Sequence, residues 1–546
     1  MLTIVYFLLA MGLGLVLRLV FLTSKDATDE WLSLWDLHRL KGRRWVTQKP
    51  LASAVDGMYG YPVLSMFIIS RFPRRRWGFA GRLLNAVYDL VAGLFVFVPL
   101  ALLFPDARVA GLPLAAAGLL IFLTTPQLLT GGSGMARMAT MKARSLGLLL
   151  VTAYFTLVFL AMHATGAWLW VAGLFAAATG VLIVLASQFG WQVMVFFSIV
   201  ISVARLTPIP MVILGVVVLA GITMPGLGAR DVLRWWLGHK VWYWHIRDFP
   251  TSATVRDRWR DYVAFFSHLL HDRKQAFEMV LKRLSLVIVA LNAPVVVLAG
   301  VLWVAVDTNF TGGSAYVVSA CLAMLLAALL TMLATMTRWL IMLGQPERYF
   351  EYAGHAAVIV FAACLTRIGP DTAAALFWLL LLFNLCVAMA YVAYFRRAHL
   401  VSSSTDATPR TDDLLAWFGT NAPDARVAIS PIKESYVLST RSMETGVAPG
   451  VEYYHRFIVR PGEWGMDNMK EVGDGLVQTP RGVEQFFDAV GATPEILRDK
   501  YGLTHLVLGN AYAEPYREQV GAERFSEIAL VYENPDYEVY SLERPE

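Results

Sequence analysis

Cysteine and charge are both scarce in this sequence. Only 3 of the 546 residues are cysteine, and 16% are charged. Cys321, Cys364 and Cys386 all lie in apolar runs, where cysteine serves as a small core side chain, so we expect neither disulfides nor a cysteine metal site. With 57% hydrophobic residues beside so few charges, the composition excludes a soluble protein.

Long apolar runs fill the first 400 residues. A transmembrane helix needs about 20 predominantly apolar residues, and runs of that length predict helices rather than a barrel. The first run lacks a basic start and a small-residue cleavage site, so we expect a retained anchor. The sequence predicts a polytopic α-helical membrane protein with about eleven transmembrane helices, over 2–22, 82–104, 109–126, 145–163, 166–186, 189–205, 208–225, 284–306, 315–343, 353–368 and 372–395.

Charge changes sign after residue 400. Residues 1–400 hold 33 basic and 17 acidic side chains, whereas residues 401–546 hold 13 and 24. We therefore expect a transmembrane domain over 1–400 and a soluble α/β domain over 401–546, joined by a linker at "VSSSTDATPRTDD". In the second domain the pattern predicts strands at "ARVAIS", "SYVLST", "HLVLGN", "IALVYE" and "YEVYSL", and helices at "RGVEQFFDAV" and "TPEILRDKYG".

Two further segments are typical of the membrane surface. Residues 226–283 mix aromatic and basic side chains at helical spacing, with 11 Lys and Arg against 6 Asp and Glu. Such helices lie in the headgroup layer, although a loop that moves over an active site has the same composition. Residues 59–70 are apolar but too short to span, so we expect them at the interface.

An acid pair, Asp29-Glu30, follows the first apolar run and precedes the helical pattern "WLSLWDLHRL". Trp31 and Trp35 fall on one side of that helix, which predicts a helix lying flat with its tryptophans at headgroup depth. The acids suit the positive end of the helix dipole. A plain N-terminal cap, made by Thr28 or Asp29, explains them equally.

The order of these elements resembles the GT-C glycosyltransferases, membrane enzymes that use polyprenyl-phosphate sugars. They include aminoarabinose transferases of lipid A, protein O-mannosyltransferases and catalytic subunits of oligosaccharyltransferase. The likeness rests on the acid pair and on short motifs at "LKGRRWVTQKP", "GYPVL", "RLL" and "GQPERYFEYAG". It implies a catalytic acid in the first external loop, so Asp29 is expected to be the base, with Glu30 or Asp26 as alternates.

The resemblance also implies a site for the donor phosphate. We expect Arg348 of "GQPERYFEYAG" to bind it, because guanidinium forms bidentate pairs with phosphate oxygens. An ion pair with Glu347 or Glu351 is the alternative. The second external loop, "TPQLLTGGSGMARMATMKARSLG", adds three further cations, Arg137, Lys142 and Arg144.

The same loop departs from the family because it holds no acid. Mg²⁺ and Mn²⁺ prefer carboxylate oxygens, so a divalent metal is not supported and no cofactor or metal site is expected. Asp89 and Asn85 lie inside an apolar run. A carboxylate there is a functional candidate by default, and a helix-to-helix hydrogen bond explains it as well.

The resemblance therefore implies transfer of a sugar to a glycan, lipid or protein acceptor. Its partners are a polyprenyl-phosphate donor and membrane lipid, with no nucleic acid. The location implied is a bacterial inner membrane with the C-terminal domain outside. Basic loops on that face conflict with the positive-inside rule, but a face that binds lipid phosphate must itself be basic. The alternatives are a flippase or transporter of lipid-linked sugars, and a polysaccharide ligase or polymerase component.

Overall fold

The computed structural model forms two compact units, each built from separate parts of the chain. Unit 1 comprises Met1–Asp26, Phe72–Thr223 and Asp257–Ser402, and unit 2 comprises Ala27–Arg71, Met224–Arg256 and Ser403–Glu546. The residues described are 2–22, 30–46, 53–55, 58–59, 61–130, 138, 141, 144–246, 257–401, 408–430, 432–454, 458–459, 493–521, 525–526 and 528–543.

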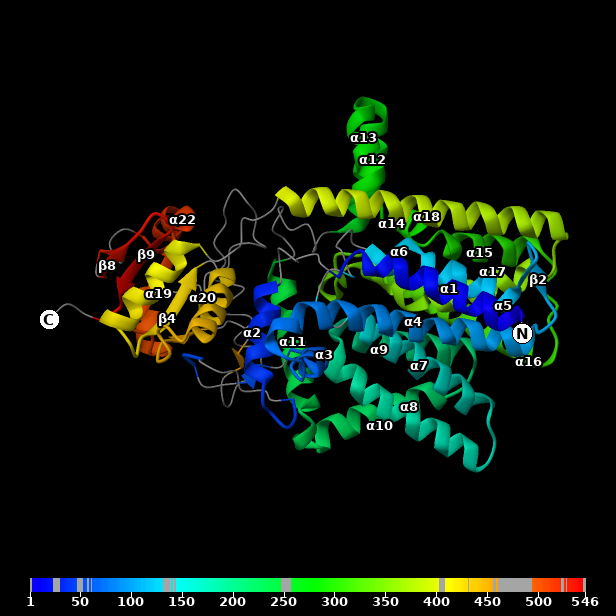
Figure 1. The fold of residues 1–546 in the computed structure, drawn as a ribbon, viewed down its shortest axis with the longest axis horizontal. Coiled ribbons are helices and arrows are strands. Elements are labelled where there is room, and N and C mark those ends of the chain that lie inside the picture. Colours follow the sequence, from blue (N-terminus) through cyan, green and yellow to red (C-terminus); the bar gives the residue numbers. More distant parts are fainter. Residues whose placement is uncertain are drawn as a thin grey trace. The chain divides into compact units, whose positions relative to one another are not determined.

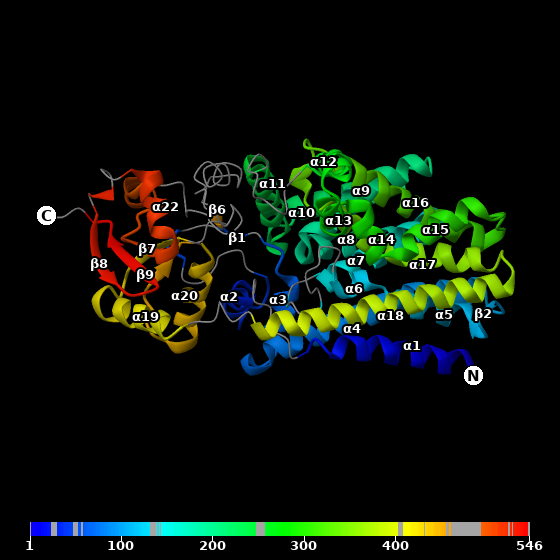
Figure 2. The same ribbon diagram turned by 90° about the horizontal axis from the view of Figure 1, so that it is seen from above.

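The described residues of unit 1 are helical apart from one short hairpin and the turns between helices. Its long helices run alongside one another (Figures 1 and 2), with α1, α4 and α5 packed together and α18 against α5. The elements are α1 (Leu2–Leu19), α4 (Trp77–Leu103), β2 (Arg108–Val109), β3 (Leu112–Pro113), α5 (Leu114–Thr124), α6 (Pro126–Thr130), α7 (Arg144–His163), α8 (Ala167–Ala186), α9 (Gln188–Ala204), α10 (Ile209–Thr223), α12 (Arg258–His271), α13 (Arg273–Lys282), α14 (Ser285–Asn292), α15 (Pro294–Ala305), α16 (Gly312–Thr335), α17 (Tyr349–Leu365) and α18 (Pro370–Val401).

Helices lie at each of the predicted spans. Among the described residues, five helices are long and apolar enough to cross a membrane, namely Arg74–Leu103, Arg144–His163, Ala167–Ala186, Gly312–Thr335 and Pro370–Tyr394. The helices α14 and α15 form a sixth candidate that is bent by 94°. The remaining predicted spans fall on shorter helices, α1, α5, α9, α10 and α17. A total of eleven crossings stays a prediction.

A buried ion pair joins the first span to the next. Arg18 of α1 donates from Nε to a carboxylate oxygen of Asp89 in α4 at 3.1 Å, and both side chains are fully buried. Its Nη1 donates to the carbonyl oxygens of Gly14 at 2.8 Å and Leu123 at 3.0 Å. Asp89 thus makes a contact between helices, with a partner in the first apolar run that sequence reasoning overlooked.

Unit 2 combines a small sheet with helices from all three of its segments. The elements are α2 (Glu30–Leu40), β1 (Met58–Tyr59), α3 (Leu64–Ile69), α11 (Ala229–Ile246), α19 (Pro409–Asn421), β4 (Arg426–Ser430), α20 (Ile432–Thr445), β5 (Glu452–Tyr453), β6 (Ile458–Val459), a π-helical turn (Ile496–Lys500), β7 (His505–Gly509), α22 (Asn510–Val520), β8 (Ala529–Glu533) and β9 (Tyr537–Ser541).

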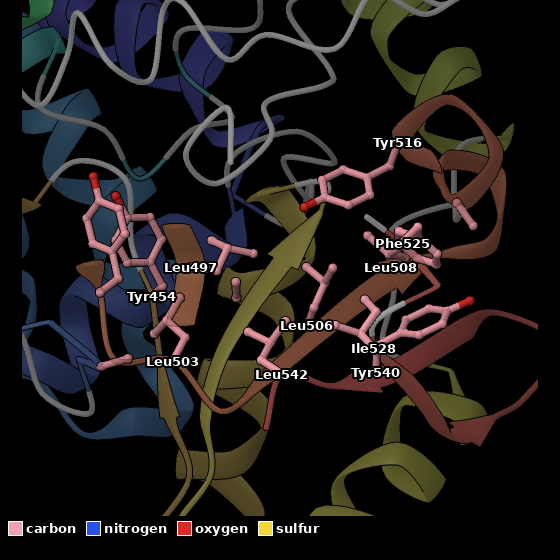
Figure 3. Close-up of a cluster of buried hydrophobic side chains, with 14 of the residues drawn as sticks. Tyr454, Leu497, Leu503, Leu506, Leu508, Tyr516, Phe525, Ile528, Tyr540 and Leu542 are labelled. Carbon is pink, nitrogen blue, oxygen red and sulfur yellow. The ribbon is translucent and has the colours of Figure 1, made fainter. Parts of the chain in front are cut away.

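The main sheet has five strands in the order β5-β4-β7-β9-β8. The strands β5, β4 and β7 are parallel, while β9 runs antiparallel to β7 and β8. Alternate side chains of a strand point to opposite faces. Val427 and Val507 therefore pack with α19 and α20, whereas Leu506 and Leu508 pack with Tyr516 of α22 on the other face (Figure 3).

The first loop is built into this domain. The amide of Ala54 donates to the carbonyl of Tyr453 at 3.0 Å, and the Arg426 side chain bonds to the carbonyl of Ala54. Strand β1 pairs antiparallel with β6, with Met58 opposite Val459. Ala54 is fully buried in the same core as the sheet residues. The loop and the tail therefore fold as one body.

Two expectations about this unit were wrong. Helix α2 does not present Trp35 to lipid, because Trp35 and Leu37 are 0% exposed and α2 packs against α20 and α3; Trp31 is half-buried. The segment "SYVLST" is part of helix α20 rather than a strand. It is buried on both sides, with Tyr436 toward Trp35 and Leu438 toward the sheet, and a doubly buried helix loses the polar face that distinguishes it from a strand.

Most of the other secondary-structure predictions for residues 401–546 were confirmed. Strands lie at "ARVAIS", "HLVLGN", "IALVYE" and "YEVYSL", and "TPEILRDKYG" contains the helical turn. The helix predicted at "RGVEQFFDAV" lies outside the described residues. The segment expected at the interface, 59–70, contains α3 (Leu64–Ile69), whose buried residues include Leu64 and Met66.

Candidate functional site

Of the three acids predicted for the base, only Glu30 lies in a described element, α2. Asp26 and Asp29 lie outside the described residues, and Glu30 is the first residue of α2, with a side chain that is not described. The helix itself is firmly held within unit 2. The Thr440 hydroxyl donates to the carbonyl of Trp31 at 3.4 Å, and the nearest atoms of His38 and Glu444 lie 3.7 Å apart. Whatever Asp29 does, the next residues of the chain are fixed by α20.

Arg348 occupies the turn before α17 in unit 1. Pro346 opens that turn, Pro346–Arg348, and its fixed φ suits the first position of a helical segment. The Arg348 guanidinium carbon lies 4.2 Å from the ring centroid of Phe189, a cation–π contact. Its Nε is buried and has no hydrogen-bond partner among the described residues. The side chain is half-buried.

Glu347, the neighbour of Arg348, is engaged elsewhere. One of its carboxylate oxygens lies 3.5 Å from Nε of Arg258 and accepts a hydrogen bond from the hydroxyl of Ser285. Arg258 is 4% exposed and Glu347 is 3% exposed. Within the described part of the chain, Arg348 forms an ion pair with neither Glu347 nor Glu351. The alternative prediction, an ion pair of Arg348 with Glu347 or Glu351, is therefore wrong for the described residues.

Aromatic and hydroxyl side chains surround Arg348 on the side of α9. Phe189 stacks on Tyr352 with centroids 5.8 Å apart and lies 4.8 Å from the ring of Tyr349. The Tyr352 hydroxyl is 3.4 Å from Oγ of Ser187. That oxygen caps α9 by accepting from the amide of Gly190 at 3.0 Å. Phe189 was missed because one aromatic residue in an apolar run carries no sequence signal of its own.

Arg144 begins α7 close to this cluster. Three residues on, a Cβ on Gly147 would lie only 2.7 Å from Cβ and Oγ of Ser187, so glycine permits α7 to approach the start of α9. Phe189, which contacts Arg348, is two residues after Ser187. The half-buried Arg144 and Arg348 thus belong to helix ends that meet near Ser187. Convergence of their side chains on one phosphate stays a prediction.

The other two cations of the second loop, Arg137 and Lys142, lie outside the described residues. Met138 and Met141 of the same loop are described, and both are buried. Met138 packs in a cluster with Phe21 at the end of α1 and Ala388 of α18. Met138 is therefore fixed in the core of unit 1.

A metal centre has no obvious donor set among the described residues, where no group of three or more His, Cys, Asp or Glu side chains comes together. Asp29 is outside that set, and so is the side chain of Glu30. The expectation that the site needs no metal stays a prediction.

Five described helices of unit 1 are long and apolar enough to cross a membrane, as in an integral membrane protein, and unit 2 is a compact α/β unit. No family model matches the sequence, and no curated protein matches it. Several solved structures are similar to the chain. ArnT from Cupriavidus metallidurans, bound to undecaprenyl phosphate, is 12% identical, with a TM-score of 0.51 over 98% of this chain and 97% of that chain.

Two structures of an oligosaccharyltransferase from Archaeoglobus fulgidus are also similar. The complex with Zn and sulfate is 11% identical, with a TM-score of 0.49 over 98% of this chain and 72% of that one. The complex of this enzyme, AglB, with an inhibitory peptide and a dolichol-phosphate is 12% identical, with a TM-score of 0.46 over 94% and 70%. The likeness to ArnT shows that the chain has the fold of the GT-C glycosyltransferases.

Proposed function

We propose that the protein is a glycosyltransferase that moves a sugar from a polyprenyl-phosphate donor to an acceptor at the external face of the membrane. A shared fold hosts many activities, so the proposal depends on the site. The observation that carries it is Arg348, a half-buried guanidinium beside a membrane bundle, with a buried Nε that has no partner among the described residues. Its neighbouring carboxylate, Glu347, is already paired with Arg258.

An anion is the ligand that suits this arrangement. Arg348 stands at the N-cap of α17, where the helix dipole favours negative charge. The Phe189 ring supports the guanidinium from one side and leaves its in-plane N–H groups for a phosphate. Arg144 would add a second cation, and Arg137 and Lys142 are further candidates from the same loop.

The chemistry then needs one base. The acceptor's hydroxyl or amine attacks the anomeric carbon, and the bond from that carbon to the phosphate oxygen breaks. The lipid phosphate leaves as an anion that Arg348 stabilises, so no general acid is required. Asp29 would take the proton from the acceptor, with Glu30 or Asp26 as alternates. No step of this proposal passes through a metal.

The segments of unit 2 support the proposed orientation. A chain returns to the same side of a membrane only after an even number of crossings. Six predicted spans separate the first segment of unit 2 from the second, and four separate the second from the third. With one span before the first, the total is eleven. In this proposal 1–400 is the catalytic transmembrane domain, and 401–546 is an external, periplasmic domain completed by the first loop.

Ligand-induced stabilisation tests the proposal without knowledge of the sugar. Undecaprenyl phosphate should raise the Tm of the purified chain in nanodiscs, and undecaprenol should not, because a ligand stabilises the state that it binds. Arg348→Gln should abolish the difference between the two lipids. Trp168→Ala, a change at an exposed site on α8, should preserve it. If both lipids act alike on the native chain, the phosphate site is refuted.

The alternatives give other outcomes in proteoliposomes. A flippase or transporter would carry labelled donor across the bilayer and leave its sugar attached. A polysaccharide ligase or polymerase component would prefer a carrier with a diphosphate. We expect neither outcome, and we expect release of polyprenyl monophosphate when a suitable acceptor is added.

A further inference from the structure

A helical hairpin projects from unit 1. Helices α12 and α13 pack against each other, run across the direction of α18 and extend beyond the other helices of unit 1 (Figure 1). Many of their apolar side chains are exposed, including Val263 at 72%, Phe266 at 62% and Leu270 at 81%. An apolar surface of this kind on a projecting element indicates an interaction site.

The composition of the hairpin favours a lipid leaflet over a protein. Trp259, Phe266 and Phe277 are exposed aromatic residues, and the exposed cations Arg273 and Lys274 lie on the same hairpin. Aromatic rings at the acyl boundary with basic groups among the headgroups are typical of interfacial helices. A hairpin that crosses the direction of a candidate span such as α18 runs along the plane of the bilayer.

The root of the hairpin is fixed to the turn that carries Arg348. Arg258 is the first residue of α12, and its amide donates to the carbonyl of Met336 at 3.1 Å. Its side chain reaches Glu347 at 3.5 Å and Asp261 at 4.0 Å. These three charges are buried or nearly so. The base of the hairpin therefore forms an ion pair, between Arg258 and Glu347, next to Arg348.

That pair has a consequence for phosphate binding. Without Arg258, the carboxylate of the adjacent Glu347 would be available to compete for Arg348, because neighbouring opposite charges in a dry setting attract strongly. We propose that the α12–α13 hairpin lies on the lipid surface and that Arg258, as a positioning residue, keeps Glu347 from neutralising Arg348. The second half of this inference rests on the proposed function, and the first does not.

Spin labels test the lipid contact. Single cysteines are placed at Phe266 and, as the control, at Lys274, in a chain whose three native cysteines are alanine. In nanodiscs the label at 266 should be accessible to oxygen and shielded from a water-soluble nickel chelate, and the label at 274 should show the reverse. Equal access to nickel at both sites overturns the contact. Shielding of 266 from both reagents also overturns it, because a protein then covers the site.

Farnesyl phosphate, with farnesol as the uncharged control, tests the role of Arg258. Arg258→Gln should weaken binding of the phosphate at least about tenfold, the scale of one lost charge-assisted contact, and leave farnesol binding unchanged. The double variant R258Q/E347Q should bind within about threefold of the native chain, since the competing carboxylate is gone. A double variant as weak as R258Q overturns the proposal, because Arg258 then acts only through the fold.

If the R258Q variant fails to fold, the single variant Glu347→Gln still tests the role of Arg258. It removes the competing charge and retains the root of the hairpin, so it should bind farnesyl phosphate at least as well as the native chain. A tenfold loss in E347Q overturns the role of Arg258. If the native chain binds farnesyl phosphate and farnesol equally, both the proposed function and the role of Arg258 are refuted. The spin-label experiment still tests the lipid contact of the hairpin independently.

Discussion

Trp35 of α2 meets Tyr436 of α20 edge-on, with ring centroids 5.8 Å apart. The first residue belongs to the loop after the first span and the second to the C-terminal domain, 401 positions later. Trp35 is fully buried, and Arg39 also lies over its ring, 5.7 Å from the centroid. The helix that follows the acid pair is thus a core element of the C-terminal domain.

Removal of the Trp35 side chain should loosen that whole region. Trp35→Ala is expected to cost about 3–5 kcal/mol, as for other buried tryptophans, and to increase hydrogen exchange at both α2 and α20. Trp168→Ala, on the exposed side of α8, should leave exchange in both helices unchanged. Faster exchange in α2 with native protection in α20 would contradict the idea that they form one body.

Reporters of membrane side test the arrangement of unit 2. Fusions at Glu546 and within 224–228 should both be active only outside the cytoplasm, because both sites belong to the unit that contains the first loop. A fusion in the turn between α7 and α8, at Gly166, should give the opposite result, because three predicted spans separate it from each flanking segment of unit 2. A C-terminal reporter active only in the cytoplasm would overturn the orientation and the placing of the loops.

Sequence patterns predicted elements well where each face of the element meets one kind of surroundings, such as lipid or the protein core. A span in lipid is apolar along its whole length, so every predicted span coincides with a helix or a helix pair. Strands β4, β7 and β9 have alternating or continuous apolar runs and were predicted as such. Tyr436 and its neighbours in α20 were assigned wrongly, because burial between α2 and the sheet removed the polar face that marks a helix.

The candidate site shows a similar limit. Arg348 was singled out by its motif, whereas the ion-pair partner of its neighbour Glu347 is Arg258, which lies 89 positions before Glu347. No local spacing relates these two residues. Trp35 was predicted to face lipid because an amphipathic helix has the same pattern whether its apolar side meets a membrane or another domain. The choice depends on tertiary contacts that one sequence does not display.

The pair between Arg18 and Asp89 should stabilise the bundle and take no part in transfer. Asp89→Asn removes the carboxylate charge that pairs with the buried guanidinium of Arg18, a change expected to cost about 3–5 kcal/mol. The double change Arg18→Met with Asp89→Leu should recover most of that loss, since apolar replacements of buried pairs are often neutral or stabilising. Thermal unfolding in detergent measures both effects. A stable double variant with no transfer activity would show that the pair has a catalytic role.

His505 should make the C-terminal domain sensitive to mild acid. Burial lowers the pKa of His505 below its usual value of 6.5 because it disfavours the charged ring, and the nearby Glu543 opposes this only in part. The ring packs beside Phe418. Protonation therefore favours the unfolded domain, so the contribution of His505 is neutral above about pH 6.5 and destabilising as the pH falls toward the lowered pKa.

The comparison of the native chain with His505→Gln isolates this effect from other titrating groups. Hydrogen exchange of the β7 amides, corrected for intrinsic rates, should show a loss of protection between pH 6.5 and 5 that is smaller in the variant. His271, which is exposed, offers the control His271→Gln with the native pH response. The same pH slope in H505Q as in the native chain would assign the acid sensitivity to other residues.

Asp29 is expected to be the catalytic base. Asp29→Asn keeps the size of the side chain and its ability to cap a helix but removes the charge that accepts a proton. Transfer should fall by roughly two to four decades, the usual contribution of a general base. Binding of undecaprenyl phosphate should be nearly unchanged, because Arg348 rather than Asp29 contacts the phosphate in the proposed site. Glu30→Gln should have a smaller effect.

The two roles of Asp29 are separated by comparing activity with stability. Asp29→Ser provides the matched control, because serine caps a helix as well as aspartate does but cannot serve as a base of similar pKa. It should lose transfer as the asparagine variant does, while hydrogen exchange in α2 stays native in both. If Asp29→Asn transfers sugar at the native rate in folded protein, the carboxylate is only a helix cap, and Glu30 or Asp26 becomes the residue to test. A fall in transfer accompanied by equal loosening of α2 would likewise assign Asp29 to the support of the helix rather than to proton transfer.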